Sequence, residues 1–203
     1  MTSISRIRRR DPAFPSLLAA IHDPPPALFL RGTGSDELLS RPAVAVVGAR
    51  SCSSYGRSVT RSLGRELAAA GLVVVSGMAR GIDGEAHRGA LDAGGITIAV
   101  LGCGIDRDYP AAHADLARRI CEDGLVVSEY EPGVEPAPWR FPARKRRGLG
   151  REPIWLNAAV APVVPAGKCA PRVVSVWSQN LDDGGVTRGL VRTRLGPGRP
   201  GRR

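Results

Sequence analysis

Apolar residues in this 203-residue chain fall into short runs that are separated by segments with a helical pattern. Four continuous, mostly β-branched runs have the pattern of buried strands: Ala43–Val47, Leu72–Val75, Thr97–Leu101 and Leu125–Val127. Three intervening segments favour helices: Tyr55–Ala70, Asp83–Ala93 and Ala111–Cys121. Strands that alternate with helices of this length predict βαβ units and a parallel sheet with right-handed crossovers. We therefore expect an α/β fold with a doubly wound, Rossmann-like sheet.

The first 41 residues have a different pattern, because prolines interrupt them at five positions between 12 and 26. Ser16–Ile21 could form one short helix, and Ala27–Leu30 a short strand or an extended arm. Met1–Arg10 holds four arginines with no apolar stretch after them, so we interpret it as a short basic arm and not as a secretion signal. No apolar run approaches the length of a membrane span.

These patterns predict three parts: a proline-rich arm or linker (residues 1–41), the incomplete Rossmann-like core (42–144) and a basic tail (145–203). The tail is rich in Arg, Gly and Pro, and prolines and glycines interrupt its short apolar pieces. We expect most of it to be disordered or poorly packed.

The net charge of +10 comes almost entirely from this tail. Residues 1–144 hold 17 basic and 16 acidic side chains, whereas residues 145–203 hold 12 and 3. A high positive charge favours nucleic-acid binding, but the core that would carry a specific site is nearly neutral. The charge is therefore no evidence that the core binds DNA.

Cysteines and histidines are scattered along the chain. The four cysteines (52, 103, 121 and 169) form no C-x-x-C pair, and the three histidines do not cluster with them. We expect no metal site. With no secretion signal, isolated cysteines fit the reducing cytoplasm.

Three glycine-rich loops follow the first three predicted core strands: residues 48–54, 76–83 and 102–106. In a doubly wound sheet, ligands bind beyond the carboxyl ends of the strands, where these loops would meet. Glycine lets the backbone approach an anion, and the N–H groups at a helix start favour negative charge. Arg50 and Arg80 add forked donors that suit phosphate. The candidate anion-binding residues are Gly48, Arg50, Ser76, Gly77, Arg80, Gly81, Gly102 and Gly104.

Interpretations of the same loops as enzyme motifs fit the sequence less well. The first loop is not G-x-G-x-x-G, no acidic residue ends the second strand, and no G-K-[ST] follows a glycine loop. A hydrolase could use Ser76, Asp83 and His87, but Ser76 lies outside a G-x-S-x-G elbow. Asp83 is more simply a helix cap or first-turn residue, and His87 a partly buried helix residue.

Aromatic residues near these loops leave two interpretations open. Tyr109 could shape the turn into the next helix or stack on a base. Trp139 and Phe141 alternate with Arg140 and Arg144, which suits nucleic acid, although aromatics that cover a core edge would give the same pattern.

The motifs together resemble the DNA-processing protein A (DprA, also Smf) family over residues 11–144. The segments that carry the resemblance are Pro24–Gly32, Val46–Arg50 with Tyr55-Gly56, Ser76–Asp83 with Ala86–Leu91, Ala99–Asp106 with Tyr109-Pro110, Ser128–Tyr130 and Phe141–Arg144. The resemblance implies a cytoplasmic protein of DNA-mediated transformation (natural competence) that is not an enzyme and uses no cofactor. It would bind single-stranded DNA without sequence preference, form a homodimer and act as a recombination mediator that helps to load the RecA recombinase. Arg50, Ser76, Gly77 and Arg80 would contact phosphate, with Arg144 nearby.

The family pattern stops at position 145, where Lys145 replaces an asparagine and the later strands and helices have no counterpart. We therefore expect the sheet to be truncated after its fourth strand, and that strand, lying beside a central first strand, to be an exposed edge. The tail is either an out-of-frame product or a genuine basic extension that binds nucleic acid. Two alternatives to a DNA-binding protein remain: a nucleotide phosphoribohydrolase-like enzyme, whose P-G-G-x-G-T-x-x-E motif is absent, and a non-functional remnant.

Overall fold

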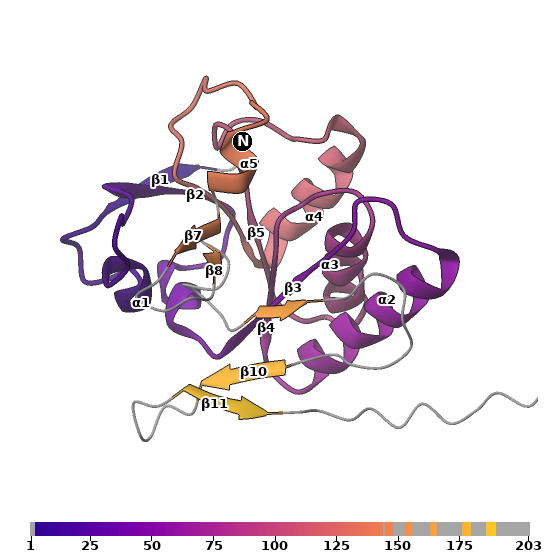
Figure 1. Ribbon diagram of the computed structural model, residues 1–203. Helices are drawn as coiled ribbons and strands as arrows, with labels where there is room; N and C mark the ends of the chain where they lie inside the picture. The colour runs from indigo at the N-terminus through magenta and orange to yellow at the C-terminus, as the bar shows by residue number, and fades with distance from the viewer. Residues whose placement is uncertain are drawn as a thin grey trace, which may run out of the picture.

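A seven-stranded mixed sheet forms the centre of the molecule, with the strand order β1-β2-β6-β5-β4-β3-β9 (Figure 1). The computed structural model describes residues 3–143, 145–147, 153–155, 163–165, 176–179 and 186–189. The predicted α/β fold is confirmed. Its four parallel core strands are β3 (Ala43–Val47), β4 (Val73–Ser76), β5 (Thr97–Val100) and β6 (Leu125–Ser128).

The helices between these strands match the predicted segments within two residues, except that the third begins as a 3₁₀ turn. They are α2 (Ser54–Ala69), α3 (Ile82–Asp92), and η2 (Ala111–His113) leading into α4 (Ala114–Asp123). Figure 1 shows α2, α3 and α4 on one face of the sheet. This is what right-handed crossovers produce when each strand is added beside its predecessor in one direction.

The N-terminal segment is not a free basic arm. β1 (Ile4–Arg8) pairs antiparallel with β2 (Ala27–Arg31), which in turn pairs antiparallel with β6. Between them lies α1 (Ser16–Ala19), and η1 (Asp36–Ser40) follows β2. Only Ile7 is buried in β1, so the segment lacks the alternation of apolar and polar residues from which a strand is predicted. Residues 4–40 therefore belong to the same sheet and core as the rest.

The expected position of the fourth strand was wrong, whereas the first strand, β3, lies between two other strands as expected. β6 is not an exposed edge beside the first strand, because β2 covers one of its sides and β5 the other. The neighbours of β3 are β4 and β9 (Val163–Pro165), both parallel to it. The sheet therefore continues past its fourth parallel strand. The winding reverses at β3, which makes the end of β3 the switch point where such sheets bind ligands.

Two apolar layers hold the sheet between the helices and the N-terminal segment. On one face, residues of α2–α4 pack on alternate strand residues such as Val46, Val74 and Val126. On the other face, Leu18 of α1 and Leu38 and Leu39 of η1 pack on Val75 and its neighbours. The proline-rich segment thus covers a sheet face that would otherwise be exposed.

Helices α2 and α3 approach each other closely through two glycines. A Cβ at Gly64 would lie 2.5 Å from the carbonyl oxygen of Ala86, and one at Gly89 would lie 2.2 Å from that of Arg61. Real Cβ atoms do not come so close to backbone oxygens. The two helix backbones are therefore in direct contact at these positions.

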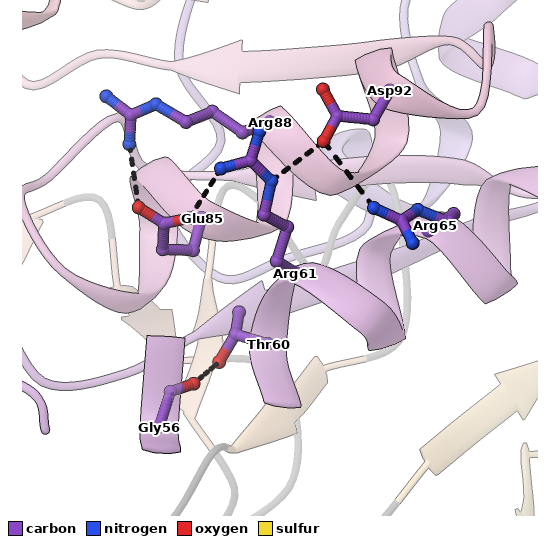
Figure 2. A network of polar contacts seen from close by, with 7 residues as sticks. All are labelled: Gly56, Thr60, Arg61, Arg65, Glu85, Arg88 and Asp92. Atoms are coloured by element: carbon purple, nitrogen blue, oxygen red, sulfur yellow. Dashed lines mark hydrogen bonds and ion pairs between the residues drawn. The ribbon is translucent and has the colours of Figure 1, made fainter. Parts of the chain in front are cut away.

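An arginine–carboxylate network crosses the exposed side of the same helix pair (Figure 2). Arg61 of α2 donates to Asp92 of α3 at 2.7 Å and lies 3.7 Å from Glu85. Arg88 donates to the same Glu85 at 3.1 Å, and Arg65 lies 3.8 Å from Asp92. The hydrogen bond from Arg61 lowers the pKa of the Asp92 carboxyl below its ordinary value. Solvent-exposed pairs of this kind contribute about 0–1 kcal/mol each, so the network aligns two helices that the backbone contact already holds.

The remaining described elements are short. α5 (Arg140–Ala143) follows the segment after β6, and β7 (Lys145–Arg147) pairs antiparallel with β8 (Pro153–Trp155). β10 (Val176–Gln179) pairs antiparallel with β11 (Val186–Gly189). Within the described residues, no helix has the length and apolarity needed to cross a membrane.

Candidate nucleic-acid interface

The first glycine loop leaves β3 and presents the start of α2 to solvent. Ser53 caps this helix, since its hydroxyl accepts a hydrogen bond from the Gly56 N–H at 3.2 Å. Ser54 and Tyr55 are exposed, and their backbone N–H groups meet no acceptor in the described part of the chain. The first turn of α2 contains no acidic residue. Free N–H groups and the positive end of the helix dipole therefore face solvent here, next to the exposed Arg50.

The second loop carries Arg80 to the same region. Arg80 is exposed, and its side chain forms no hydrogen bond or ion pair with any residue that the structure describes. Met78 precedes it in a left-handed conformation (φ 64°), which costs a non-glycine residue about 1–2 kcal/mol. Burial of its side chain against Cys103, Ile105 and Leu116 contributes about 1.5–3 kcal/mol and offsets this strain. The apolar core thus holds the turn that presents Arg80.

Backbone contacts join the two arginine-bearing loops. Gly81 has a positive φ of 78°, and a Cβ there would lie 2.4 Å from the Ala49 carbonyl oxygen. The Ile82 N–H donates to that same oxygen at 3.2 Å. Asp83, 5% exposed, accepts from the Gly48 N–H at 3.4 Å and from the Ala79 N–H at 3.3 Å. The predicted role of Asp83 as a simple helix cap is therefore too narrow, because its carboxylate links both loops.

The start of α3 is less suited to an anion than the start of α2. Its N–H groups at Ile82, Gly84 and Glu85 donate to carbonyls of the chain itself, and Asp83 and Glu85 place negative charge in its first turn. The sequence led us to expect free N–H groups at each helix start. The structure supports that expectation for α2 and contradicts it for α3.

The third glycine loop is covered by the chain that follows β6. Gly102 and Gly104 are buried, and the Gly104 N–H donates to the Val134 carbonyl at 2.8 Å. The Ser128 hydroxyl donates to the Cys103 carbonyl at 2.6 Å. The Gly104 N–H therefore supports the neighbouring segment, and burial keeps both glycines away from a ligand at the surface.

Ser76 and Gly77 lie beneath the surface. Ser76 is 0% exposed, and its hydroxyl donates to the Val46 carbonyl at 2.6 Å, which joins β4 to β3. Gly77 is buried as well. Arg144 lies outside the described residues. Of the residues predicted from the sequence, Arg50 and Arg80 thus reach the surface as charged groups, whereas Gly48 and Gly81 shape the loops that carry them.

Aromatic rings and arginines are layered beside Arg50. Its guanidinium lies over the Phe141 ring, 5.3 Å from the ring centre. Phe141 stacks on Tyr109 with 5.3 Å between the ring centres, and Arg140 lies over Tyr130 at 5.3 Å. Trp139 is 71% exposed and Tyr109 42% exposed. Trp139 therefore does not simply cover a core edge, whereas Phe141 packs against Tyr109 and Arg50. The exposure of Trp139 and Tyr109 favours the interpretation in which these two rings are available to bases.

His87 has a structural position that excludes the hydrolase triad. It is fully buried, and its Nδ1 lies 2.7 Å from the Thr97 hydroxyl oxygen. That hydroxyl donates to the Val74 carbonyl, so it accepts from His87 and fixes the proton on Nδ1. Ser76, Asp83 and His87 thus each bind other partners, as a triad would not.

The buried His87 should make the protein less stable in acid. Burial, with smaller contributions from His113 and Arg88, lowers the pKa of His87 to about 3, below the 6.5 of the unfolded chain. Below pH 6.5 the unfolded state therefore binds a proton at His87 that the folded state does not bind. As the pH falls through this range, the free energy of unfolding decreases by about 1.4 kcal/mol per pH unit. We expect the stability difference between the protein and its His87→Asn variant to shift by about 2 kcal/mol, in favour of the variant, between pH 7 and pH 5. Urea denaturation at both pH values measures this, and a constant difference would contradict it.

Known proteins share both the sequence and the fold. The family model of DNA recombination-mediator protein A matches residues 5–158, which is 14 residues beyond the resemblance that ended at position 144. DNA processing protein DprA of Streptococcus pneumoniae is 46% identical over 140 residues, covering 67% of this chain and 47% of that protein. The putative DprA of Mycobacterium tuberculosis is 48% identical over 147 residues, covering 72% and 36%. The chain spans less than half the length of these relatives.

Two solved structures agree with these matches. The X-ray structure of DprA from Streptococcus pneumoniae has a TM-score of 0.70 at 40% identity, covering 80% of this chain and 54% of that one. DNA processing protein A from Helicobacter pylori, whose structure addresses its single-stranded DNA binding mode, has a TM-score of 0.67 at 32% identity, covering 81% and 71%. The family match, the relatives and the shared fold together lead to one conclusion: the chain belongs to the DNA recombination-mediator protein A (DprA/Smf) family.

Proposed function

We propose that this chain binds single-stranded DNA without sequence preference, at the edge where β3 and β4 end. The observation that carries the proposal is the exposed start of α2, whose free N–H groups follow the loop of the exposed Arg50, and that loop is joined by backbone contacts to the loop of the unpaired Arg80. A phosphate suits such a site, because N–H groups, the helix dipole and guanidinium forks all favour it. The Helicobacter pylori relative, which binds single-stranded DNA, supports the same ligand.

The aromatic residues beside Arg50 explain why the ligand would be single-stranded. Unpaired bases stack on exposed rings, and every base has a face that can stack, so such binding is tolerant of sequence. Tyr109, stacked on the Phe141 ring that contacts Arg50, provides one such ring, and the exposed Trp139, two residues before Phe141, provides another. In this proposal Gly48, Gly77 and Gly81 shape the loops, Ser76 ties their strands together, Gly102 and Gly104 support the segment before Trp139, and Arg144 is a further phosphate contact.

The wider role follows from family membership. We propose that the protein acts in the cytoplasm during DNA-mediated transformation, where it protects incoming DNA and helps to load a RecA-type recombinase, as a homodimer and without catalysis. The family is described as a recombination mediator, and this supports a binding protein over an enzyme. The comparisons do not favour the phosphoribohydrolase-like alternative.

Fluorescence anisotropy with labelled oligo-dT and oligo-dA tests the site. We expect Arg50→Ala and Arg80→Ala each to weaken binding by about five- to tenfold, as the loss of a charge-assisted contact of about 1–1.4 kcal/mol does. Each should also reduce the slope of log affinity against log salt by about 0.7. Both oligonucleotides should be affected alike.

Arg118→Ala is the matched control, because Arg118 is equally charged and lies on α4 with its side chain 71% exposed. Its removal should leave affinity within about twofold. The tail carries an excess charge of +9, so the comparison is repeated at elevated salt, where non-specific attraction is screened. Equal affinities for the protein and all three variants at both salt concentrations would refute the proposed site.

A further inference from the structure

His113 holds the turn that presents Arg80. Its Nδ1 lies 3.0 Å from the Met78 carbonyl oxygen, 35 residues earlier in the chain. A carbonyl only accepts hydrogen bonds, so Nδ1 carries the proton and donates it. His113 is 7% exposed, which shields this bond from competing water.

The same peptide group is held from its other side by Asp83. The Met78 carbonyl and the Ala79 N–H belong to one peptide unit: the former accepts from His113, and the latter donates to the Asp83 carboxylate at 3.3 Å. Met78 is also the one described non-glycine residue with a positive φ. Two side chains from different helices thus fix a peptide plane that a relaxed loop would turn elsewhere, one residue before Arg80.

The His113 imidazole packs against Gly84 of α3, where the absence of a side chain leaves room for the ring. A Cβ at Gly84 of α3 would lie 2.8 Å from the His113 Cε1, so only glycine leaves room for the ring. His113 precedes α4, and its own N–H donates to the Pro110 carbonyl at 2.8 Å. The ring is thereby held at both its backbone and its side chain.

We infer that His113 is a positioning residue for DNA binding: it sets the direction of Arg80 through the Met78–Ala79 peptide and touches no DNA itself. The inference rests on the proposed single-stranded DNA site. It implies that the benefit of His113 is delivered chiefly through Arg80, because the imidazole bonds directly to the turn before Arg80. The Arg50 loop is joined to that turn through Asp83 and the Ile82 N–H.

Two substitutions separate the hydrogen bond from the bulk of the ring. His113→Leu removes the donor, whereas His113→Asn retains an N–H group close to the position of Nδ1. We expect His113→Leu to weaken binding to oligo-dT about fivefold, and His113→Asn to restore most of it. Asn binding no better than Leu would overturn the inference.

Double variants show through which arginine His113 affects the affinity for oligo-dT. His113→Leu should cost about fivefold in the Arg50→Ala background but less than about twofold in the Arg80→Ala background. A general structural defect would cost the same in both backgrounds, and that result would also overturn the inference.

Hydrogen–deuterium exchange gives a readout that needs no DNA. Peptides spanning residues 77–81 should exchange faster in His113→Leu than in the unaltered protein or in His113→Asn. If the unaltered protein fails to bind oligo-dT, the proposed function fails, while this exchange pattern still decides whether His113 holds the turn. Unchanged exchange would refute the positioning role even if DNA binding is confirmed.

Discussion

Replacement of Asp83 by alanine is expected to lower both stability and DNA affinity, the latter on the order of tenfold if two contacts of about 0.7 kcal/mol are lost. The carboxylate is 5% exposed and accepts the N–H groups of Gly48 and Ala79. Without it, both donors lose their partner, at a cost of about 1–3 kcal/mol. The loops that carry Arg50 and Arg80 then lose a shared support.

One effect opposes this loss. Removing a negative charge close to the phosphate site strengthens long-range attraction, but such attraction between partly solvated groups amounts to about 1 kcal/mol and is screened by salt. We therefore expect the geometric loss to dominate, and to do so more clearly at high salt.

Urea denaturation and oligo-dT anisotropy measure the two effects. Asp115→Ala is a suitable control, because this α4 carboxylate is 86% exposed; it should leave stability and affinity nearly unchanged. Asp83→Asn keeps the shape of the side chain and one acceptor oxygen. Its stability and its affinity for oligo-dT should fall between those of Asp83→Ala and those of Asp115→Ala. An Asp83→Ala protein that binds as tightly as the unaltered one at all salt concentrations would show that the loops do not depend on this carboxylate.

Replacement of Gly89 by valine is expected to have the largest effect on stability, about 3 kcal/mol or more. A Cβ at this position would lie 2.2 Å from the Arg61 carbonyl oxygen. A backbone oxygen has no other rotamer to adopt, so α2 and α3 must separate. Their separation would also stretch the hydrogen bond from Arg61 to Asp92 shown in Figure 2.

Ser62→Val isolates this clash from the helix propensity of valine, since Ser62 is an exposed residue of α2. It should cost less than about 1 kcal/mol. Thermal and urea denaturation compare the two variants. If Gly89→Val were no less stable than Ser62→Val, this result would contradict a direct backbone contact between α2 and α3 at Gly89.

Local patterns were sufficient to locate the four parallel strands and their helices. Their apolar runs and helical spacing are properties of short segments, as the agreement for β3 and α2 illustrates. The strand order was not accessible in this way, because pairing depends on residues far apart in the chain. The antiparallel pairing of Phe29 with Ser128 has no local signal in either segment.

In the candidate site, too, some features follow from short segments of sequence and others depend on contacts between distant residues. The glycine loops were placed at the correct edge of the sheet, and Arg50 and Arg80 are exposed there as expected. Whether a loop is open to a ligand depends on what packs against it. The engaged hydroxyl of Ser76 and the covering of Gly104 by Val134 are set by contacts across the fold, and spacing alone does not reveal them.

The position of β2 beside β6 has a consequence for how the molecule assembles during synthesis. The β1–β2 pair is synthesised before β6, yet the edge on which it docks is completed only when Ser128 has been made. Until then its pairing partner does not exist, and contacts that span so much of the chain form slowly. Strands β1 and β2 are thus synthesised before the four parallel strands but dock only after the last of these has formed.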